Sequence, residues 1–244
     1  MTQPSEECMT PPSEEVVTTK VPYLFGIEVK ISSVETTKPG EWISTEVIDI
    51  CLEKNRLEIC ADNTAKSRCI VFGTGVDPIV FRDYKDNLRL DPEVQKHLNN
   101  VFDKGYQKIG SPNVDDIDAV MYPHFDSGHY TLTVVWVKDR KVTYCDSFGG
   151  FKPDVCEKIL KFTVDQLNRF CNKSKSIKFH EFLKRIYLHP NMPTQSNNYD
   201  CGFYVIKAAE CIMRGENISF TDDVIATLRK NVHEMVSKAF YACN

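Results

Sequence analysis

Residues 195–214 read QSNNYDCGFYVIKAAECIMR, a polar loop that runs into an almost wholly apolar segment. From Cys201 onward the segment carries only three charged side chains, and these recur at i, i+3 and i+7, which predicts a buried helix with one narrow polar stripe. Cys201 would then stand at the N-terminus of this helix, where the helix dipole stabilises a thiolate. Gly202 follows directly and leaves room for the backbone of a substrate. This is the placement that a nucleophilic cysteine requires.

The chain has ten cysteines among 244 residues, but no secretory segment and no tight cysteine spacing. We therefore expect reduced thiols in the cytoplasm or the nucleus, and not a disulfide framework. Cys51, Cys60 and Cys69 are evenly spaced, yet no CxxC or HxxxH pair accompanies them, so no metal site is expected. The cysteines other than Cys201 are interpreted as buried, inert thiols.

Two strands and a turn bring a second pair of candidate residues together. Residues 129–138 are rich in β-branched and aromatic side chains, which is typical of a buried strand, and residues 141–146 return after a tight turn at 139–140. If the two strands pair through this turn, His129 and Asp146 lie at the same edge of the sheet, where the carboxylate can hold one tautomer of the imidazole. Taken alone, His129 is more often a structural histidine, and Asp146 a turn residue or a helix cap.

The rest of the chain is expected to place helices and strands around this hairpin. Residues 1–20 are polar and acidic and are interpreted as a disordered tail, which leaves 21–244 as a single domain. Further strands are predicted at 23–33, 117–122 and 184–189, and helices at 43–54, 92–102, 153–171, 201–214 and 224–239, with irregular structure at 61–85.

The composition limits the class of partner. The net charge is −4 and the basic residues are scattered, so no nucleic-acid partner is expected, because phosphate binding needs clustered positive charge. No apolar run approaches the roughly 20 residues that span a bilayer, so no membrane contact is expected. With 42% hydrophobic and 26% charged residues the chain can form a core of its own, and we expect a monomer.

Four motifs occur in the order that one enzyme family shows. Residues 193–202, PTQSNNYDCG, resemble the P-x-Q-x-N-x-x-D-C-G motif of the Ulp/SENP family of cysteine proteases at every fixed position. Residues 128–132, GHYTL, resemble the family's histidine strand, and residues 144–150, YCDSFGG, resemble its Y-x-D-S-x-G-G segment. Residues 41–48, EWISTEVI, are similar to its W-L-N-D-E-V-I helix. The resemblance runs from about residue 25 to the C-terminus.

This resemblance implies an α+β papain-like fold of the Ulp type, in which a central mixed sheet is flanked by helices and the nucleophile begins a buried helix. It implies that Cys201 attacks the carbonyl after a Gly-Gly sequence, that His129 moves the proton and that Asp146 orients His129. The side chain of Gln195 and the backbone N–H of Cys201 would form the oxyanion hole. No metal or organic cofactor is needed for this chemistry.

The resemblance also implies two aromatic residues that bind the substrate. Trp42 and Tyr130 would flank a narrow tunnel that admits only a Gly-Gly tail. Tyr130 stands where relatives usually have tryptophan, and Thr45 stands where they have an acidic residue that faces a basic surface of the modifier. We therefore expect a protease that removes a ubiquitin-like modifier from lysines and processes its precursor. SUMO is the favoured modifier, with a Nedd-class protein and ubiquitin as alternatives.

Two other functions share parts of this pattern. A YopJ-like acetyltransferase has His, an acid and Cys in the same order, but the spacing of Gln195 and the Trp42 helix favour the protease. A modifier-binding module without activity is the third interpretation, although all four catalytic positions are filled in this chain. Binding of coenzyme A would reveal the acetyltransferase, and reaction with an electrophilic modifier would exclude the inactive module.

Overall fold

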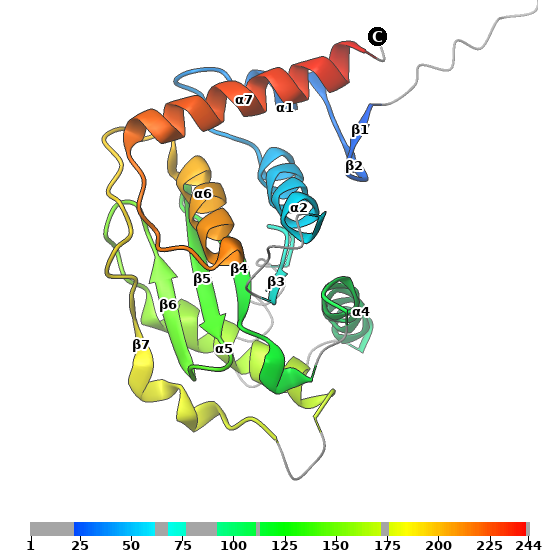
Figure 1. Ribbon diagram of the computed structural model, residues 1–244, viewed down its shortest axis with the longest axis vertical. Coiled ribbons are helices and arrows are strands. Elements are labelled where there is room, and N and C mark those ends of the chain that lie inside the picture. Colours follow the sequence, from blue (N-terminus) through cyan, green and yellow to red (C-terminus); the bar gives the residue numbers. More distant parts are fainter. Residues whose placement is uncertain (1–21, 62–67, 77–91, 111–112, 172–175, 243–244) are drawn as a thin grey trace, which may run out of the picture.

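A mixed five-stranded sheet forms the centre of the computed structural model, which describes residues 22–61, 68–76, 92–110, 113–171 and 176–242 (Figure 1). Its strands, in spatial order, are β3 (Cys69–Val71), β4 (Ala119–Asp126), β5 (His129–Trp136), β6 (Lys141–Cys145) and β7 (Ile186–Leu188). The three central strands pair antiparallel, while the outer pairs, β3 with β4 and β6 with β7, are parallel.

Helices cover both faces of the sheet. They are α1 (Ile31–Glu35), α2 (Thr45–Ala61), α4 (Pro92–Lys108), α5 (Pro153–Asn168), α6 (Cys201–Arg214) and α7 (Asp222–Tyr241). α2 and α6 pack on one face and α4 and α5 on the other, while α7 lies across the top of α6 and α2 in Figure 1. Within the described residues, no helix has the length and apolarity needed to span a bilayer. The smaller elements are β1 (Tyr23–Leu24), β2 (Ile27–Glu28) and the 3-10 turns Val114–Asp116, Phe179–Glu181 and Leu183–Arg185.

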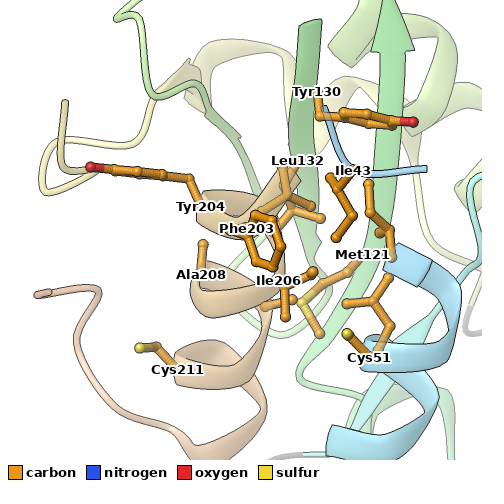
Figure 2. Packing of buried hydrophobic residues seen from close by; sticks show 14 of the residues in the cluster. Ile43, Cys51, Met121, Tyr130, Leu132, Phe203, Tyr204, Ile206, Ala208 and Cys211 are labelled. Carbon is orange, nitrogen blue, oxygen red and sulfur yellow. The ribbon is translucent and has the colours of Figure 1, made fainter. Parts of the chain in front are cut away.

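Two hydrophobic cores, one on each face of the sheet, hold the layers together. β5 contributes to both, because neighbouring residues of a strand point to opposite faces. Leu132 and Val134 join the core beneath α2 and α6, whereas Val135 joins the core beneath α4 and α5. Figure 2 shows the first of these cores, in which Phe203 and Ile206 of α6 lie beside Leu132. β5 is therefore buried along almost its whole length, which explains its continuous run of β-branched and aromatic residues.

The structure confirms the predicted α+β class and most of the predicted elements. The hairpin is present, with Trp136 opposite Lys141 and Leu132 opposite Cys145. Arg140 in its turn adopts a φ of 51°. The helices predicted to begin near 43, 92, 153, 201 and 224 correspond to α2, α4, α5, α6 and α7, and the strands predicted at 117–122 and 184–189 correspond to β4 and β7.

Two predictions of local structure are wrong. The single strand predicted at 23–33 is a β-hairpin followed by α1, because Phe25 and Gly26 adopt positive φ and turn the chain back. The irregular stretch predicted at 61–85 contains β3, whose three residues are too few for an alternating pattern to show. The tail predicted at 1–20, like part of the 61–85 stretch, lies outside the described residues.

Candidate active site

Cys201 is the first residue of α6 and is almost completely buried, with 3% of its surface exposed. The carbonyl of Asp200 accepts hydrogen bonds from the backbone N–H groups of Phe203 (2.8 Å) and Tyr204 (3.1 Å), which begins the helix. The N–H groups of Cys201 and Gly202 precede the first helical hydrogen bonds, and the helix dipole places partial positive charge at this end. A thiolate at Cys201 Sγ and an oxyanion of the substrate are both stabilised there.

The sulfur of Cys201 also accepts a hydrogen bond from β5. The backbone N–H of Tyr130 lies 3.5 Å from Cys201 Sγ. Tyr130 is the second residue of β5, so the strand that carries His129 also supplies a donor to Cys201 Sγ. No sequence motif indicates this contact, because it depends on how β5 lies against α6.

His129 and Asp146 form the pair that the hairpin predicts. His129 Nε2 lies 2.7 Å from Asp146 Oδ1. Because Cys145 lies opposite Leu132, the next residue after β6 reaches the end of β5 that carries His129. His129 Nδ1 is buried and forms no hydrogen bond of regular geometry with the described residues, which leaves this nitrogen to exchange a proton with Cys201.

The charge state of His129 follows from its surroundings. Burial lowers the pKa of His129, but the interactions with Asp146 and with the Cys201 side chain outweigh burial and raise the pKa from 6.5 to about 9. An imidazole with this pKa holds its proton at neutral pH. A thiolate is the attacking form of cysteine, and a thiolate at Cys201 would form an ion pair with this imidazolium.

The turn after β6 encloses the Asp146 carboxylate. The backbone N–H of Phe148 donates to Asp146 Oδ1 at 2.7 Å, and the N–H of Gly149 donates to the Asp146 carbonyl at 3.0 Å. A Cβ atom on Gly150 would lie 2.6 Å from Asp146 Oδ2, so a larger residue would displace the carboxylate. Both glycines of this segment therefore allow the turn to close around Asp146. Gly149 adopts a φ of 75°, and Gly150 has no side chain to displace the carboxylate.

Phe148 covers one face of the His129 imidazole. The rings of Phe148 and His129 stack, with centroids 4.6 Å apart and planes inclined by 25°. Phe148 is 52% exposed, so its outer side is open to a substrate. The motif does not indicate this contact, because Phe148 occupies a position of the Y-x-D-S-x-G-G segment that any residue can fill.

Gln195 is buried in the loop before α6. Ser147 Oγ donates a hydrogen bond to Gln195 Oε1, and the backbone N–H of Gln195 donates to the Ser147 carbonyl at 3.0 Å. Gln195 Nε2 donates to the Asn197 carbonyl at 2.6 Å, which uses one of its two N–H groups. These contacts hold the amide in one orientation and leave the second N–H for an oxygen of the substrate, the role that the motif predicts.

Trp42 lies at the surface beside the start of β5. A Cβ atom on Gly128 would lie 2.8 Å from Trp42 Cη2, so the indole rests directly on Gly128, the residue before His129. The indole is 47% exposed. It therefore forms an exposed aromatic surface beside the residue that precedes His129, where the sequence predicts a substrate contact.

The other two residues predicted to bind the substrate are held in the core. Tyr130 is 5% exposed, because the alternation along β5 turns its side chain toward the core (Figure 2). Its ring also contacts that of Phe125, with centroids 4.6 Å apart. A Cβ atom on Gly202 would overlap Ile43 Cγ2 and come within 3.0 Å of Ile48 Cδ1. Packing of α6 against α2 thus requires glycine at this position, a reason that the sequence did not suggest. The substrate contacts of Tyr130 and Gly202 stay predictions.

Comparison with known families places this site in context. Residues 41–242 match the Ulp1 protease family, C-terminal catalytic domain. The chain belongs to the Ulp1 protease family. Members of this family are cysteine proteases, and the matched range contains Trp42, His129, Asp146 and Cys201.

Curated relatives of this Ulp1-family chain are similar at low identity. Ubiquitin-like-specific protease 1A of Arabidopsis thaliana is 23% identical over 195 residues, which cover 79% of this chain and 36% of the relative. Sentrin-specific protease 2 of Homo sapiens is 24% identical over 132 residues, which cover 52% of this chain and 22% of the relative. The chain therefore spans well under half of the length of these two relatives.

Solved structures of Ulp1-family domains share the fold of this chain. One is the C-terminal Ulp1 protease domain in complex with Smt3, the yeast orthologue of SUMO, which has a TM-score of 0.59 at 17% identity. The match covers 89% of this chain and 86% of the chain in that structure. The catalytic domain of the Ulp1-like SUMO protease of Chaetomium thermophilum has a TM-score of 0.60 at 19% identity, with coverage of 93% and 90%. The predicted Ulp-type fold is thereby confirmed.

Proposed function

We propose that this chain cleaves the bond after the C-terminal Gly-Gly of a ubiquitin-like modifier, with SUMO as the favoured modifier. It would release the modifier from lysines of its targets and process the modifier's precursor. The observation that carries the proposal is the 2.7 Å hydrogen bond between His129 Nε2 and Asp146 Oδ1, next to a Cys201 sulfur that receives the Tyr130 N–H at the start of α6.

The first half of the proposed reaction forms a thioester. The Cys201 thiolate attacks the carbonyl carbon of the last glycine, and the negative charge moves to the carbonyl oxygen. The backbone N–H of Cys201 and the remaining N–H of Gln195 Nε2 are the donors for that oxyanion. The His129 imidazolium, held by Asp146, gives its proton to the lysine nitrogen as the C–N bond breaks, and the target leaves as an amine.

The second half of the reaction hydrolyses the thioester. Neutral His129 takes a proton from a water molecule, whose oxygen attacks the thioester carbonyl. The C–S bond breaks, the modifier leaves with a free carboxyl group, and Cys201 leaves as a thiolate. The imidazolium is present again beside the thiolate, so the site returns to the charge state in which the cycle began.

The choice of modifier is supported by neighbouring features. The indole of Trp42 lies against Gly128 and is exposed, so a flat aromatic surface is available to a chain without side chains. The relatives carry the names ubiquitin-like-specific and sentrin-specific protease, and one solved neighbour is bound to Smt3. Thr45 begins α2, close in sequence to Trp42, and removes a negative charge that the family usually has. For this reason a Nedd-class protein and ubiquitin remain alternatives.

Covalent labelling tests the proposal directly. The chain is incubated separately with SUMO, a Nedd-class protein and ubiquitin, each carrying an electrophile at its C-terminus, and adducts are resolved by mass. We expect an adduct with SUMO that is absent in Cys201→Ala. The prediction that all cysteines other than Cys201 are buried is wrong for Cys60, which is exposed near the end of α2. Cys60→Ala therefore serves as the matched control and should keep the adduct.

The other outcomes separate the competing functions. An adduct with the Nedd-class protein or with ubiquitin alone supports the protease and replaces SUMO as the modifier. Binding of a modifier without an adduct would overturn the protease in favour of an inactive binding module. If no modifier binds, a coenzyme A titration follows, since binding of coenzyme A would identify an acetyltransferase.

A further inference from the structure

Arg229 of α7 is a buried cation that lies outside all four motifs; 5% of its surface is exposed. Its Nε and Nη2 atoms lie 2.9 and 2.5 Å from Asp200 Oδ1, and Nη2 also lies 3.3 Å from the Tyr199 carbonyl. Asp200 directly precedes Cys201 and ends the loop of residues 195–200, which we call the nucleophile loop. A buried arginine is rare unless it is paired, and here the partner is the nucleophile loop.

Arg229 also binds the segment that leads to the exposed indole. Its Nη1 atom donates to the Lys38 carbonyl at 2.6 Å. The same carbonyl accepts the backbone N–H of Glu41, the residue before Trp42, at 3.2 Å. One planar guanidinium therefore joins two distant stretches of chain, one leading to Trp42 and the other to Cys201.

A continuous row of hydrogen bonds leads from Arg229 to the predicted oxyanion donor. Asp200 Oδ2 accepts a hydrogen bond from Asn197 Nδ2 at 2.7 Å. Asn197 Oδ1 accepts the backbone N–H of Asp200 at 3.0 Å, and the Asn197 carbonyl accepts Gln195 Nε2 at 2.6 Å. These contacts connect the guanidinium to the Nε2 side of the Gln195 amide, while Ser147 holds its Oε1.

Arg229 also compensates a negative charge beside the nucleophile. Asp200 is about nine-tenths buried and is adjacent to Cys201 in the chain. An unpaired carboxylate in this position would oppose the formation of a thiolate, because a nearby like charge disfavours ionisation. The Arg229 guanidinium pairs with this carboxylate and opposes its negative charge.

We propose that Arg229 is a positioning residue with two separate effects. Through Asp200 and Asn197 it sets the orientation of Gln195, and by pairing with Asp200 it keeps the carboxylate charge from opposing the Cys201 thiolate. The first effect rests on the proposed protease function. The second concerns only Cys201 and can be measured without a modifier.

Alkylation of Cys201 by iodoacetamide tests the charge effect. The rate is followed against pH by mass spectrometry of the peptide that contains Cys201, so that other thiols do not interfere. Arg229→Gln leaves the carboxylate unpaired and should raise the pH midpoint by about one unit, whereas Asp200→Asn leaves the cation unpaired and should lower it. Shifts in the same direction, or no shift in either variant, would overturn this part of the proposal, because damage to the fold has no reason to act with opposite signs.

Turnover of a modifier conjugate tests the geometric effect. In Arg229→Lys the charge is kept but the planar fork is lost, so the alkylation midpoint should stay near that of the wild type. We expect kcat to fall at least about tenfold in this variant while KM changes by less than about threefold, because Arg229 acts through Gln195 and not on the substrate. If Arg229→Gln does not fold, Arg229→Lys and Asp200→Asn carry the same test.

A matched control separates positioning from stability. Val236 lies on the same helix, seven residues further along, and is completely buried in the core beneath α2 and α6. Val236→Ala lowers the melting temperature without changing any charge or hydrogen bond. If Arg229→Lys loses no more turnover than Val236→Ala, compared equally far below the melting temperature of each, the positioning role is refuted. A wild-type chain that forms no adduct with any modifier refutes the protease instead, and the alkylation test still stands.

Discussion

The ring of Phe148 stacks on the imidazole of His129, with 4.6 Å between the centroids and 25° between the planes. The stack restrains the tilt of the imidazole, while the hydrogen bond from Nε2 to Asp146 restrains its rotation in the plane. Two contacts from one short turn therefore define the position of a single ring. Since Phe148 is half exposed, the same ring is also open to the substrate.

Phe148→Ala is expected to lower kcat/KM about tenfold, because an imidazole with more freedom spends less time in the reactive orientation. Cleavage of a modifier fusion measures the effect, with the melting temperature recorded alongside. Tyr241→Ala removes another exposed aromatic ring, at the end of α7, and should leave kcat/KM unchanged. Equal activity in both variants would show that the stack has no role in the reaction.

Activity should decline at high pH with a midpoint of about 9. The pKa of His129 is raised to about 9, so the imidazolium that protonates the leaving amine is lost as the pH rises through this value. Asp146→Asn removes the charge that pairs with the imidazolium, so this limb should move to lower pH, and kcat should fall by roughly 10²–10⁴. Profiles of kcat/KM against pH for both proteins measure the shift.

The same titration affects folding. Because the pKa of His129 in the folded chain lies above its unfolded value of 6.5, its contribution to the free energy of unfolding is complete below about pH 6.5 and is lost as the pH rises through about 9. Asp146→Asn should flatten this part of the stability profile. An alkaline limb at the same pH in both proteins would assign it to a group other than His129.

Gln195→Ala is expected to lower kcat by about 10²–10³ with little change in KM, since the oxyanion exists only in the transition state. Ser147→Ala serves as the control, because it removes the hydroxyl that holds Gln195 Oε1 but leaves the donor nitrogen in place. In Ser147→Ala, kcat should fall about tenfold. A loss in Gln195→Ala no greater than that in Ser147→Ala would argue against a direct oxyanion contact.

Asp49→Asn should stabilise the fold at neutral pH. Burial raises the pKa of Asp49 to about 6, even though its carboxylate accepts the N–H of Thr74 at 2.8 Å and the Thr74 hydroxyl at 3.2 Å. Because this pKa lies above the unfolded value of 3.8, the contribution of Asp49 is complete below about pH 3.8 and is lost as the pH rises through 6. Asparagine can still accept the Thr74 N–H, so the gain at pH 7 should be on the order of 1 kcal/mol.

Denaturant unfolding between pH 4 and pH 8 measures this gain, which should disappear toward pH 4. Glu53→Gln on the same helix provides a control of opposite sign. Burial raises the pKa of Glu53, but the ion pairs with Arg56 and Lys108 outweigh burial and lower it. Glu53→Gln should therefore lose stability at neutral pH. A loss in Asp49→Asn as well would show that the carboxylate is not destabilised in the folded chain.

Gly202→Ala should destabilise the fold by about 1–3 kcal/mol, because the added methyl group would overlap Ile43 Cγ2 in a packed interface. Calorimetric unfolding measures the loss. In the double variant with Ile43→Ala, the added methyl group has space, so the combined loss should be smaller than the sum of the two single losses. If the loss of stability in the double variant equals the sum of the two single losses, the overlap with Ile43 is not the cause of the destabilisation.

The hairpin and the buried helix could be predicted because both depend on local information. The spacing of His129 and Asp146 around the turn at 139–140 determines which end of the sheet they reach. The period of the charged residues after Cys201 determines which face of α6 is polar. The four motifs then identified the family, and with it the fold.

The orientation of side chains on β5 could not be predicted. This strand is buried on both faces, so its apolar pattern does not show which side each residue takes. The ring of Tyr130 lies in the core and its backbone N–H contacts the sulfur of Cys201, while its predicted substrate contact stays a prediction. The face of the sheet to which each β5 side chain points is determined by the helices that pack on the two faces, and not by the sequence of the strand.

Arg229 shows the same limit. Its helix has an ordinary amphipathic pattern, and its pairing with Asp200 exists because α7 lies against α6 and buries both charges, each of which then requires a partner. Local spacing was sufficient to place Cys201 at a helix start and to bring His129 and Asp146 together, while their proposed roles as nucleophile, base and acid come from the resemblance of the motifs to the family. The contacts that position these groups, such as those of Arg229 with Asp200 and of the Tyr130 N–H with Cys201 Sγ, were decided by the tertiary structure. They join segments that are distant in sequence and depend on how the helices pack on the sheet, so no local sequence pattern predicts them.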